Sequence, residues 1–167
     1  MAGDVDAGLV EPARQIIKLA TDQQAMIAAA ESCTGGLIMA SLTSIAGSSS
    51  AVDRGFVTYT NEAKQEQLGV PPSIIETYGA VSQETAEAMV HGVFKQAKMA
   101  EIAVSVTGIA GPGGGSDLKP VGLVYIGYGR RGGEIGIEKC LFDGDRATVR
   151  HETVLKAFSL IEGLLGA

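Results

Sequence analysis

Ser32 lies in a polar turn whose residue types suit a nucleophile. The turn, residues 30–36 (AESCTGG), follows the apolar run Met26–Ala29 and precedes the helix-forming run Leu37–Leu42. This order predicts a buried strand, a tight turn and a helix. A serine hydroxyl in such a turn lies at the positive end of the helix, among backbone N–H groups without partners inside it. We therefore predict that Ser32 is a nucleophile.

A serine nucleophile needs a base, and Lys64 is the predicted one. The two histidines are His91, within a long predicted helix, and His151, in the first turns of the last helix, so neither follows a strand. Lys64 lies about three residues into a predicted helix, where the helix dipole and burial both disfavour a positive charge. The neutral amine that results can accept the proton of Ser32. Tyr59, at the end of the preceding strand, could pass protons between them or orient a substrate.

Each of these residues also has an ordinary structural interpretation. Serine and threonine in small turns usually cap a helix, and a lysine in a first helical turn is usually solvated. A further hypothesis for the same turn makes Cys33 the nucleophile in place of Ser32. A free cysteine more often packs as a small buried hydrophobic residue. The sequence therefore leaves a catalytic turn and a simple helix cap as alternatives.

A glycine-rich segment, Thr107–Pro120, is the second unusual feature. Its five glycines favour close approach of the backbone to a ligand, and its many N–H groups could bind a phosphate. It is not a Walker A loop, because Gly114 occupies the position of the required lysine. It is not a dinucleotide-binding fingerprint either, because no helix pattern follows the glycines. A flexible lid is the alternative interpretation.

Apolar runs and helix signals alternate along the first two thirds of the chain, and a hairpin follows. The predicted strands are Met26–Ala30, Arg54–Thr60, Ile102–Val106, Val121–Tyr128 and Glu134–Phe142. The predicted helices are Leu9–Ala20, one from the Ser32 turn to about Ile45, Glu62–Leu68 with Asn61 as its cap, Pro72–Tyr78, Gln83–Lys98 capped by Ser82, and one that begins at 143–145. The order predicts a mostly parallel sheet with one antiparallel strand, helices on both faces, and the first three strands in central positions.

Ligands of open α/β sheets bind beyond the carboxyl ends of the parallel strands. Three segments follow such ends in this sequence: 32–36, 59–64 and 107–115. If the first three strands are parallel, the three segments share one edge of the sheet. The sequence therefore predicts a single site there.

The composition suits one packed domain, 46% hydrophobic and 167 residues long. A net charge of −6 and scattered basic residues disfavour nucleic-acid binding as the main function. Two cysteines make no disulfide framework, and no apolar run approaches the roughly 20 residues that a membrane span needs. The acidic first residues lack the pattern of a signal peptide, so we expect a cytoplasmic protein without membrane partners.

Six motifs of this sequence resemble those of the CinA C-terminal domain family. They are residues 30–36 (AESCTGG), 59–64 (YTNEAK), 79–82 (GAVS), 107–114 (TGIAGPGG), 119–122 (KPVG) and 144–146 (GDR). The resemblance extends over about residues 9–165. It implies an α/β fold, a three-layer α/β/α sandwich with a mixed, mostly parallel sheet of about five strands, formed by residues 1–167 as a single stand-alone domain.

The family includes nicotinamide-nucleotide amidases. The resemblance therefore implies hydrolysis of the carboxamide of nicotinamide mononucleotide to nicotinate mononucleotide and ammonia, in pyridine-nucleotide salvage. It implies no metal or other cofactor, a homo-oligomeric assembly and a small-molecule substrate as the partner. A nucleotide-binding or regulatory module without catalysis is the alternative.

The resemblance also implies roles for individual residues. Ser32 is the nucleophile and Lys64 the base, with help from Tyr59 and Thr107, and Arg146 is the candidate for binding the substrate's phosphate. The residues expected to contact the substrate are Thr34, Gly35, Gly36, Asn61, Thr107, Gly108, Ala110, Gly111, Gly113 and Arg146.

Overall fold

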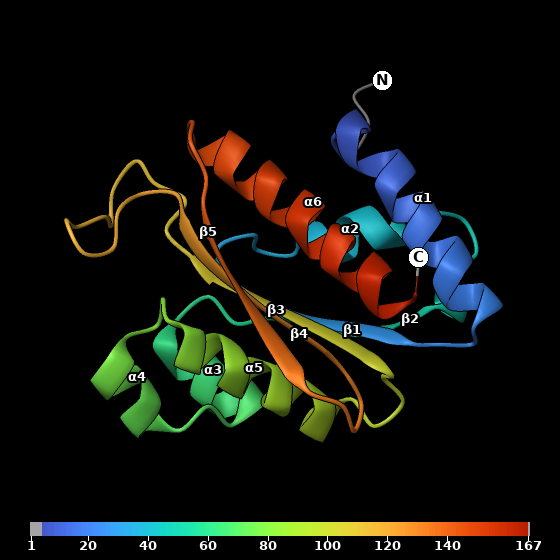
Figure 1. Cartoon of the computed structure of the whole chain (residues 1–167), viewed down its shortest axis with the longest axis horizontal. Coiled ribbons are helices and arrows are strands. Elements are labelled where there is room, and N and C mark those ends of the chain that lie inside the picture. The colour runs from blue at the N-terminus through green and yellow to red at the C-terminus, as the bar shows by residue number, and fades with distance from the viewer. Residues whose placement is uncertain (1–4, 167) are drawn as a thin grey trace.

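A mixed five-stranded sheet lies between two layers of helices in the computed structural model, which describes residues 5–166 (Figure 1). The strands are β1 (Ile27–Glu31), β2 (Val52–Val57), β3 (Ile102–Gly108), β4 (Leu123–Arg130) and β5 (Ile135–Leu141). The helices are α1 (Ala7–Asp22), α2 (Leu37–Thr43), the 3-10 helix η1 (Ser48–Ser50), α3 (Asn61–Leu68), α4 (Pro72–Tyr78), α5 (Gln83–Gln96) and α6 (Arg146–Leu164). Helices α1, α2 and α6 cover one face of the sheet, and α3, α4 and α5 cover the other (Figure 1). The predicted fold class is confirmed.

The sheet order is β2-β1-β3-β4-β5, and β1 pairs in parallel with both β2 and β3. Strand β4 is antiparallel to β3, and β5 is antiparallel to β4. The register aligns Ala30 with Phe56 on one side and with Ser105 on the other. The carboxyl ends of the three parallel strands therefore meet at one edge, and the turns that follow them are neighbours, as the sequence predicts.

Side chains of β1 alternate between the two cores, as the two-residue period of a strand requires. Ile27 and Ala29 pack in the core under α1, α2 and α6, whereas Ala28 and Ala30 pack in the core under α3, α4 and α5. Because the alanines are small, both helix layers can approach the strand closely. Glu31 is next in the alternation and faces α2, where two backbone N–H groups donate hydrogen bonds to its carboxylate.

Four helices begin at a side chain that accepts a hydrogen bond from a backbone N–H of the first turn. These caps are Asp6, Thr60, Ser82 and Asp145. The prediction of Asn61 as the cap of α3 is wrong. Thr60 has extended backbone angles and its hydroxyl accepts from Ala63 N at 3.0 Å, so Asn61 is the first helical residue.

Strand β2 also differs from its prediction. It ends at Val57, three residues earlier than expected, and it forms an edge of the sheet rather than a central strand. Only β1 pairs with it, so its residues are half-buried or exposed. The early end leaves residues 58–60 free to turn toward the site.

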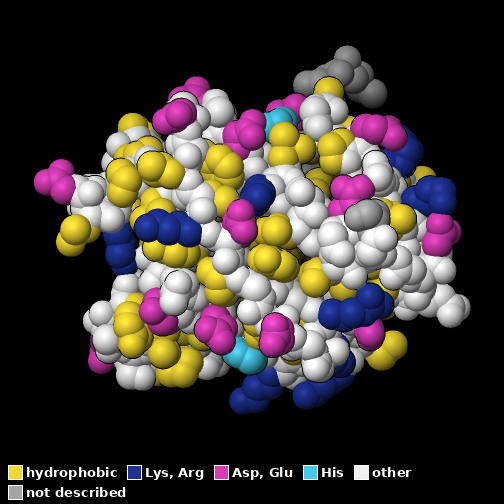
Figure 2. All heavy atoms as spheres, viewed as in Figure 1, with side chains coloured by type: hydrophobic (Ala, Val, Ile, Leu, Met, Phe, Trp, Pro, Cys, Tyr) yellow, Lys and Arg dark blue, Asp and Glu magenta, His cyan; other side chains and the backbone are white. Residues whose placement is uncertain are grey.

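The surface on the face shown in Figure 2 carries Lys and Arg side chains scattered among Asp and Glu. This face therefore has no continuous basic area of the kind that nucleic-acid binding proteins use. Within residues 5–166, no helix has both the length and the apolar composition for a membrane span.

The close packing of α5 against the end of α3 yields a stability prediction. A Cβ at Gly92 would lie 2.2 Å from Leu68 O, so Gly92→Ala should lower the free energy of unfolding by about 1–3 kcal/mol through overpacking. The matched control is Gly163→Ala in α6, where a Cβ would meet nothing within 4 Å. That change should be neutral or stabilise by up to about 1 kcal/mol, because alanine favours helix. Urea denaturation of both variants measures the difference, and equal effects would contradict this packing.

Candidate active site

The turn after β1 holds Ser32 at the shared edge of the sheet. Ser32 N donates a hydrogen bond to Val106 O at 3.1 Å, which ties the turn to β3. Gly35 N donates to Ser32 O at 3.0 Å and closes the turn. Gly35 and Gly36 have φ of 58° and 104°, which glycine adopts without strain. The chain can therefore reverse tightly between β1 and α2.

Lys64 meets Ser32 at this turn. Its Nζ donates hydrogen bonds to Ser32 Oγ and to Thr58 O, both at 2.9 Å. Lys64 is 1% exposed and Ser32 is 7% exposed, so the pair is almost entirely buried. The carbonyl group belongs to Thr58, the residue that follows β2, and Lys64 lies in the first turn of α3. The structure thus brings together the two residues that the sequence singled out.

Burial lowers the pKa of Lys64 from 10.5 to about 8, because desolvation penalises the ammonium form. A substantial fraction of molecules then carries the neutral amine near physiological pH. That amine can accept the hydroxyl proton of Ser32 while one of its own N–H groups still donates to Thr58 O. The geometry can therefore activate a serine without histidine.

Cys33 adjoins Ser32 but lacks the ionisation that a nucleophilic cysteine needs. Burial raises the pKa of its thiol to about 12, so it stays protonated under ordinary conditions. The thiolate is the reactive form of cysteine. The structure therefore disfavours the alternative in which Cys33 is the nucleophile.

A cleft of about 220 Å³ opens beside Ser32. It is lined by Ser32, Cys33, Tyr59, Gly108, Ile109, Ala110, Gly111, Gly113, Gly114 and Arg146. Across residues 5–166, no acceptor in the protein pairs with the backbone N–H groups of Cys33, Thr34, Gly113 or Gly114. The cleft thus combines a buried hydroxyl, an amine behind it and main-chain donors from two segments.

Arg146 joins three segments at the mouth of the cleft. Its Nη1 donates to Gly111 O at 2.8 Å, and its Nη2 donates to the Tyr59 hydroxyl at 3.1 Å. Tyr59 is 59% exposed, and the direct bond between Lys64 and Ser32 leaves no gap for it to bridge. Tyr59 thus does not lie between Ser32 and Lys64, and its place at the mouth suits the other predicted role, orienting a substrate.

Five predicted contact residues do not line this cleft: Thr34, Gly35, Gly36, Asn61 and Thr107. The Thr34 hydroxyl donates to Glu31 Oε1 at 2.7 Å, and the Thr107 hydroxyl donates to Ala80 O at 2.7 Å. Asn61 is exposed on α3. The threonine hydroxyls thus hold the protein's own backbone and turn in place, because each already has a protein acceptor.

Arg150 was missed by sequence reasoning. It follows Arg146 by four residues on α6, so both arginines lie on one face of the helix. Arg150 Nη2 donates to Thr34 O at 3.0 Å. Both arginines line a larger cavity of about 660 Å³ that shares Ala110 and Arg146 with the cleft. The four-residue spacing of two arginines in the first turns of a helix is the signal that could have found it.

Glu31 was also missed, whereas the cleft residues Ile109 and Gly114 were predicted only as part of the glycine-rich segment. Glu31 is fully buried, and its carboxylate accepts three hydrogen bonds from Thr34 and α2. A lone glutamate at the end of an apolar strand is the sequence signal, because such a charge needs partners when buried. Among the described residues, no three His, Cys, Asp or Glu side chains gather as a metal-ligand set.

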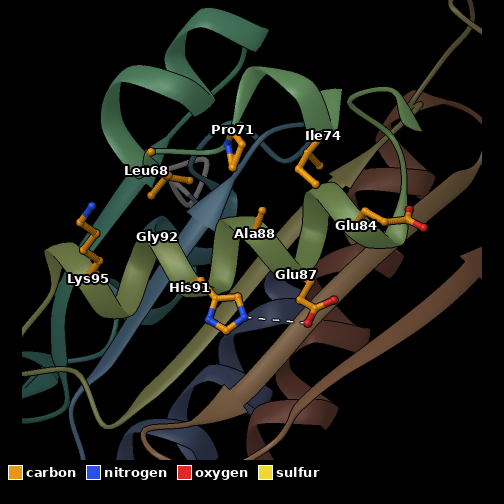
Figure 3. A pocket seen from close by; sticks show the side chains of 10 residues that line it. Leu68, Pro71, Ile74, Glu84, Glu87, Ala88, His91, Gly92 and Lys95 are labelled. Carbon is orange, nitrogen blue, oxygen red and sulfur yellow. Dashed lines mark ion pairs between the residues drawn. The ribbon is translucent and has the colours of Figure 1, made fainter. Parts of the chain in front are cut away.

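A second groove, of about 400 Å³, lies on the opposite layer between α5 and the α3–α4 segment (Figure 3). Leu68, Pro71 and Ile74 face Ala88 and Gly92 across it in Figure 3. Its histidine forms an ion pair with a glutamate of the same helix, at 3.8 Å. Its lining contains no serine or cysteine nucleophile, so the smaller cleft at Ser32 is the candidate active site.

The family model of the CinA C-terminal domain matches residues 10–165. A nicotinamide-nucleotide amidohydrolase PncC of Enterobacter agglomerans is 52% identical over 80% of this chain and 80% of its own length. A CinA-like protein of Akkermansia muciniphila is 44% identical over 87% of this chain and 34% of its own length. The chain spans about a third of the length of the first curated relatives that it matches.

Solved structures show the same fold. The crystal structure of competence/damage inducible protein CihA from Agrobacterium tumefaciens has a TM-score of 0.93 and 47% sequence identity, and the match covers 98% of this chain and 99% of that one. The likeness extends over the whole sheet and both helix layers.

The lowered pKa of Lys64 predicts how stability changes with pH. Between pH 8 and 10.5 the unfolded chain keeps the Lys64 proton that the folded protein releases, so Lys64 should contribute a rise of about 3 kcal/mol to the free energy of unfolding. The raised pKa of the buried Cys33 thiol acts in the opposite direction above about pH 9, because the unfolded chain loses that proton first. Lys64→Met should lack this rise, whereas Lys18→Met, which removes an exposed lysine, should keep it. Urea denaturation between pH 7 and 11 measures the three slopes. Parallel curves for the native protein and Lys64→Met would contradict the prediction.

Proposed function

The chain belongs to the CinA C-terminal domain family, and we propose that it is an amidohydrolase acting on nicotinamide mononucleotide. The products are nicotinate mononucleotide and ammonia. The observation that carries the proposal is the buried hydrogen bond of 2.9 Å between Lys64 Nζ and Ser32 Oγ. The names of the relatives that are nicotinamide-nucleotide amidohydrolases supply the substrate.

Ser32 Oγ attacks the carboxamide carbon in the first half of the reaction. The neutral Lys64 amine accepts the hydroxyl proton as the new C–O bond forms. The resulting ammonium then donates that proton to the carboxamide nitrogen, the C–N bond breaks, and ammonia leaves. An ester between Ser32 and the nicotinoyl group remains, with Lys64 neutral again.

Water completes the reaction. Lys64 removes a proton from the water that attacks the ester carbonyl, and then returns a proton to Ser32 Oγ as the ester bond breaks. The nicotinate product leaves as a carboxylate, so its remaining proton passes to solvent. The same amine thus serves as base and acid in each half, which requires that its pKa lie near the working pH.

The tetrahedral intermediates carry a negative oxygen that needs hydrogen-bond donors. The backbone N–H group of Cys33 follows the nucleophile directly, and those of Gly113 and Gly114 lie in the glycine-rich segment; all three residues line the cleft, and none of these N–H groups has an acceptor within residues 5–166. Loss of one such donor typically costs a hundredfold or more, on the order of 3 kcal/mol. The turn therefore supplies the nucleophile and one donor, and the glycine-rich segment supplies the others.

The charged end of the nucleotide fits the arginine side of the site. Arg146 lies at the mouth of the cleft, and Arg150 lines the adjoining cavity with it. Their guanidinium groups can pair with phosphate through two parallel hydrogen bonds. With the pyridine ring in the cleft, the phosphate then reaches the larger cavity and fixes the amide beside Ser32.

A binding module without catalysis would also use a glycine loop with free N–H groups. The buried lysine favours the enzyme, because a binding site has no need for a desolvated amine held against a serine hydroxyl. The proposal also includes one domain over residues 1–167, a cytoplasmic location, homo-oligomeric assembly and a place in pyridine-nucleotide salvage.

Ser32→Ala tests the nucleophile. It should lower kcat for ammonia release from nicotinamide mononucleotide by about 10³-fold or more, because the covalent route is lost. Cys33→Ala, at the neighbouring position, is the matched control and should lower kcat by less than about tenfold, because the thiol stays protonated. The reverse order of the two effects would make Cys33 the nucleophile, and unchanged turnover in Ser32→Ala would exclude the covalent mechanism.

The role of Lys64 as base predicts the pH profile. The rate should rise as pH increases through about 8, where Lys64 loses its proton, and should level off above that value. The measurement is kcat/KM for nicotinamide mononucleotide between pH 6 and 10, with circular dichroism at each pH to show that the protein stays folded. A flat profile would count against Lys64 as the base.

A further inference from the structure

The carboxylate of Glu31 is fully buried one residue before Ser32. A buried charge is costly unless hydrogen bonds compensate it. Its Oε1 accepts from Thr34 Oγ1 at 2.7 Å and from Ile38 N at 2.8 Å, and its Oε2 accepts from Met39 N at 3.1 Å. The sequence thus places a charged acceptor inside the core where three donors meet.

These donors belong to the turn and to the first residues of α2. Gly36 precedes the first residue of α2, Leu37, and has no side chain that could cap the helix. Glu31 takes the place of a cap from the end of β1, seven residues before Ile38. The carboxylate therefore links the last residue of the central strand to the helix that follows the turn.

The same bonds enclose the reacting part of the turn. Ser32 and Cys33 lie between Glu31 and Thr34, whose side chains are joined at 2.7 Å. Arg150 Nη2 also donates a hydrogen bond to the carbonyl oxygen of Thr34. The bond between the Glu31 and Thr34 side chains therefore closes a ring of four residues that contains Ser32 Oγ and the N–H group of Cys33.

We propose that Glu31 is the positioning residue of this turn, whose carboxylate keeps Ser32 against Lys64 and the free N–H group of Cys33 in place for the substrate oxygen. Glu31 touches neither the reacting atoms nor the cleft, and it acts through Thr34 and α2. The inference rests on the proposed amidase function for its kinetic consequences, and on the hydrogen bonds alone for its conformational ones.

The proposed role of Glu31 depends on its negative charge and on both of its carboxylate oxygens. Glu31→Gln removes the charge and one acceptor oxygen while it keeps the size of the side chain. The amide oxygen of glutamine can keep two of the donors, but its NH₂ group faces Met39 N, a donor against a donor. Thr34→Val removes a single donor, the hydroxyl, with little change of shape. Ser41→Ala is the matched control, because Ser41 is buried on the same helix and the change removes its part-buried hydrogen bond of 2.7 Å to Leu37 O without touching Glu31.

The experiment has a kinetic and a conformational readout. The first is kcat and KM for nicotinamide mononucleotide. The second is the rate at which iodoacetamide alkylates Cys33 in the folded protein, followed by peptide mass spectrometry, with the buried thiol of Cys140 as the internal reference. Circular dichroism and the melting temperature show that each variant is folded.

Glu31→Gln should lower kcat by about tenfold to a hundredfold and change KM by less than about threefold, because displacing the turn harms the reacting groups more than the binding surface. Cys33 should be alkylated about tenfold faster or more, and Cys140 at an unchanged rate, as the turn loosens. Thr34→Val should show the same effects more weakly, and the two changes should be non-additive. Ser41→Ala should leave both readouts within about twofold of the native protein.

Folded Glu31→Gln with native kcat and native Cys33 alkylation would overturn the inference. Equal losses in Ser41→Ala would also overturn it, because they would show a general weakening of α2. If Glu31→Gln does not fold, Thr34→Val decides by the same two readouts. If the native protein releases no ammonia but Glu31→Gln still accelerates Cys33 alkylation, the amidase proposal fails and the positioning of the turn by Glu31 stands.

Discussion

The hydrogen bond between the buried Lys64 amine and the Ser32 hydroxyl is the constraint on which the site depends. Removing an ammonium from water costs several kcal/mol, and two hydrogen bonds of 2.9 Å compensate part of it. The remainder appears as the lowered pKa of Lys64, about 8. The energetic cost of burying the lysine is therefore also the property that lets it accept a proton.

The sheet explains how residues far apart in the sequence reach this pair. Three parallel strands end at one edge, so the Ser32 turn, the Lys64 helix and the glycine loop all begin there. The chain returns from the glycine-rich segment to the sheet through the antiparallel strand β4, and α6 then places Arg146 at the mouth of the cleft. Rigid strands and helix starts, rather than long loops, thus hold the nucleophile and its base.

The Ser32–Lys64 pair could be predicted because both residues follow strands that the apolar pattern identifies, and parallel order makes such neighbours adjacent. The contact of Tyr59 with Arg146 joins residues 87 positions apart, and no periodic pattern encodes it. Glu31 was overlooked because a carboxylate that caps a helix across a turn has no fixed spacing, unlike a cap at the helix start. The order of strands, turns and helices along the chain can thus be predicted from the sequence. The side-chain contacts across the carboxyl edge of the sheet can be identified only in the folded structure.

The most direct test of the central claim is an incubation of the purified protein with nicotinamide mononucleotide, without added metal, in which ammonia and nicotinate mononucleotide are both quantified. The buried serine–lysine pair predicts catalytic turnover with the two products in equal amounts. A folded protein that binds the nucleotide and releases neither product would contradict it, and would favour a nucleotide-binding module on the same fold.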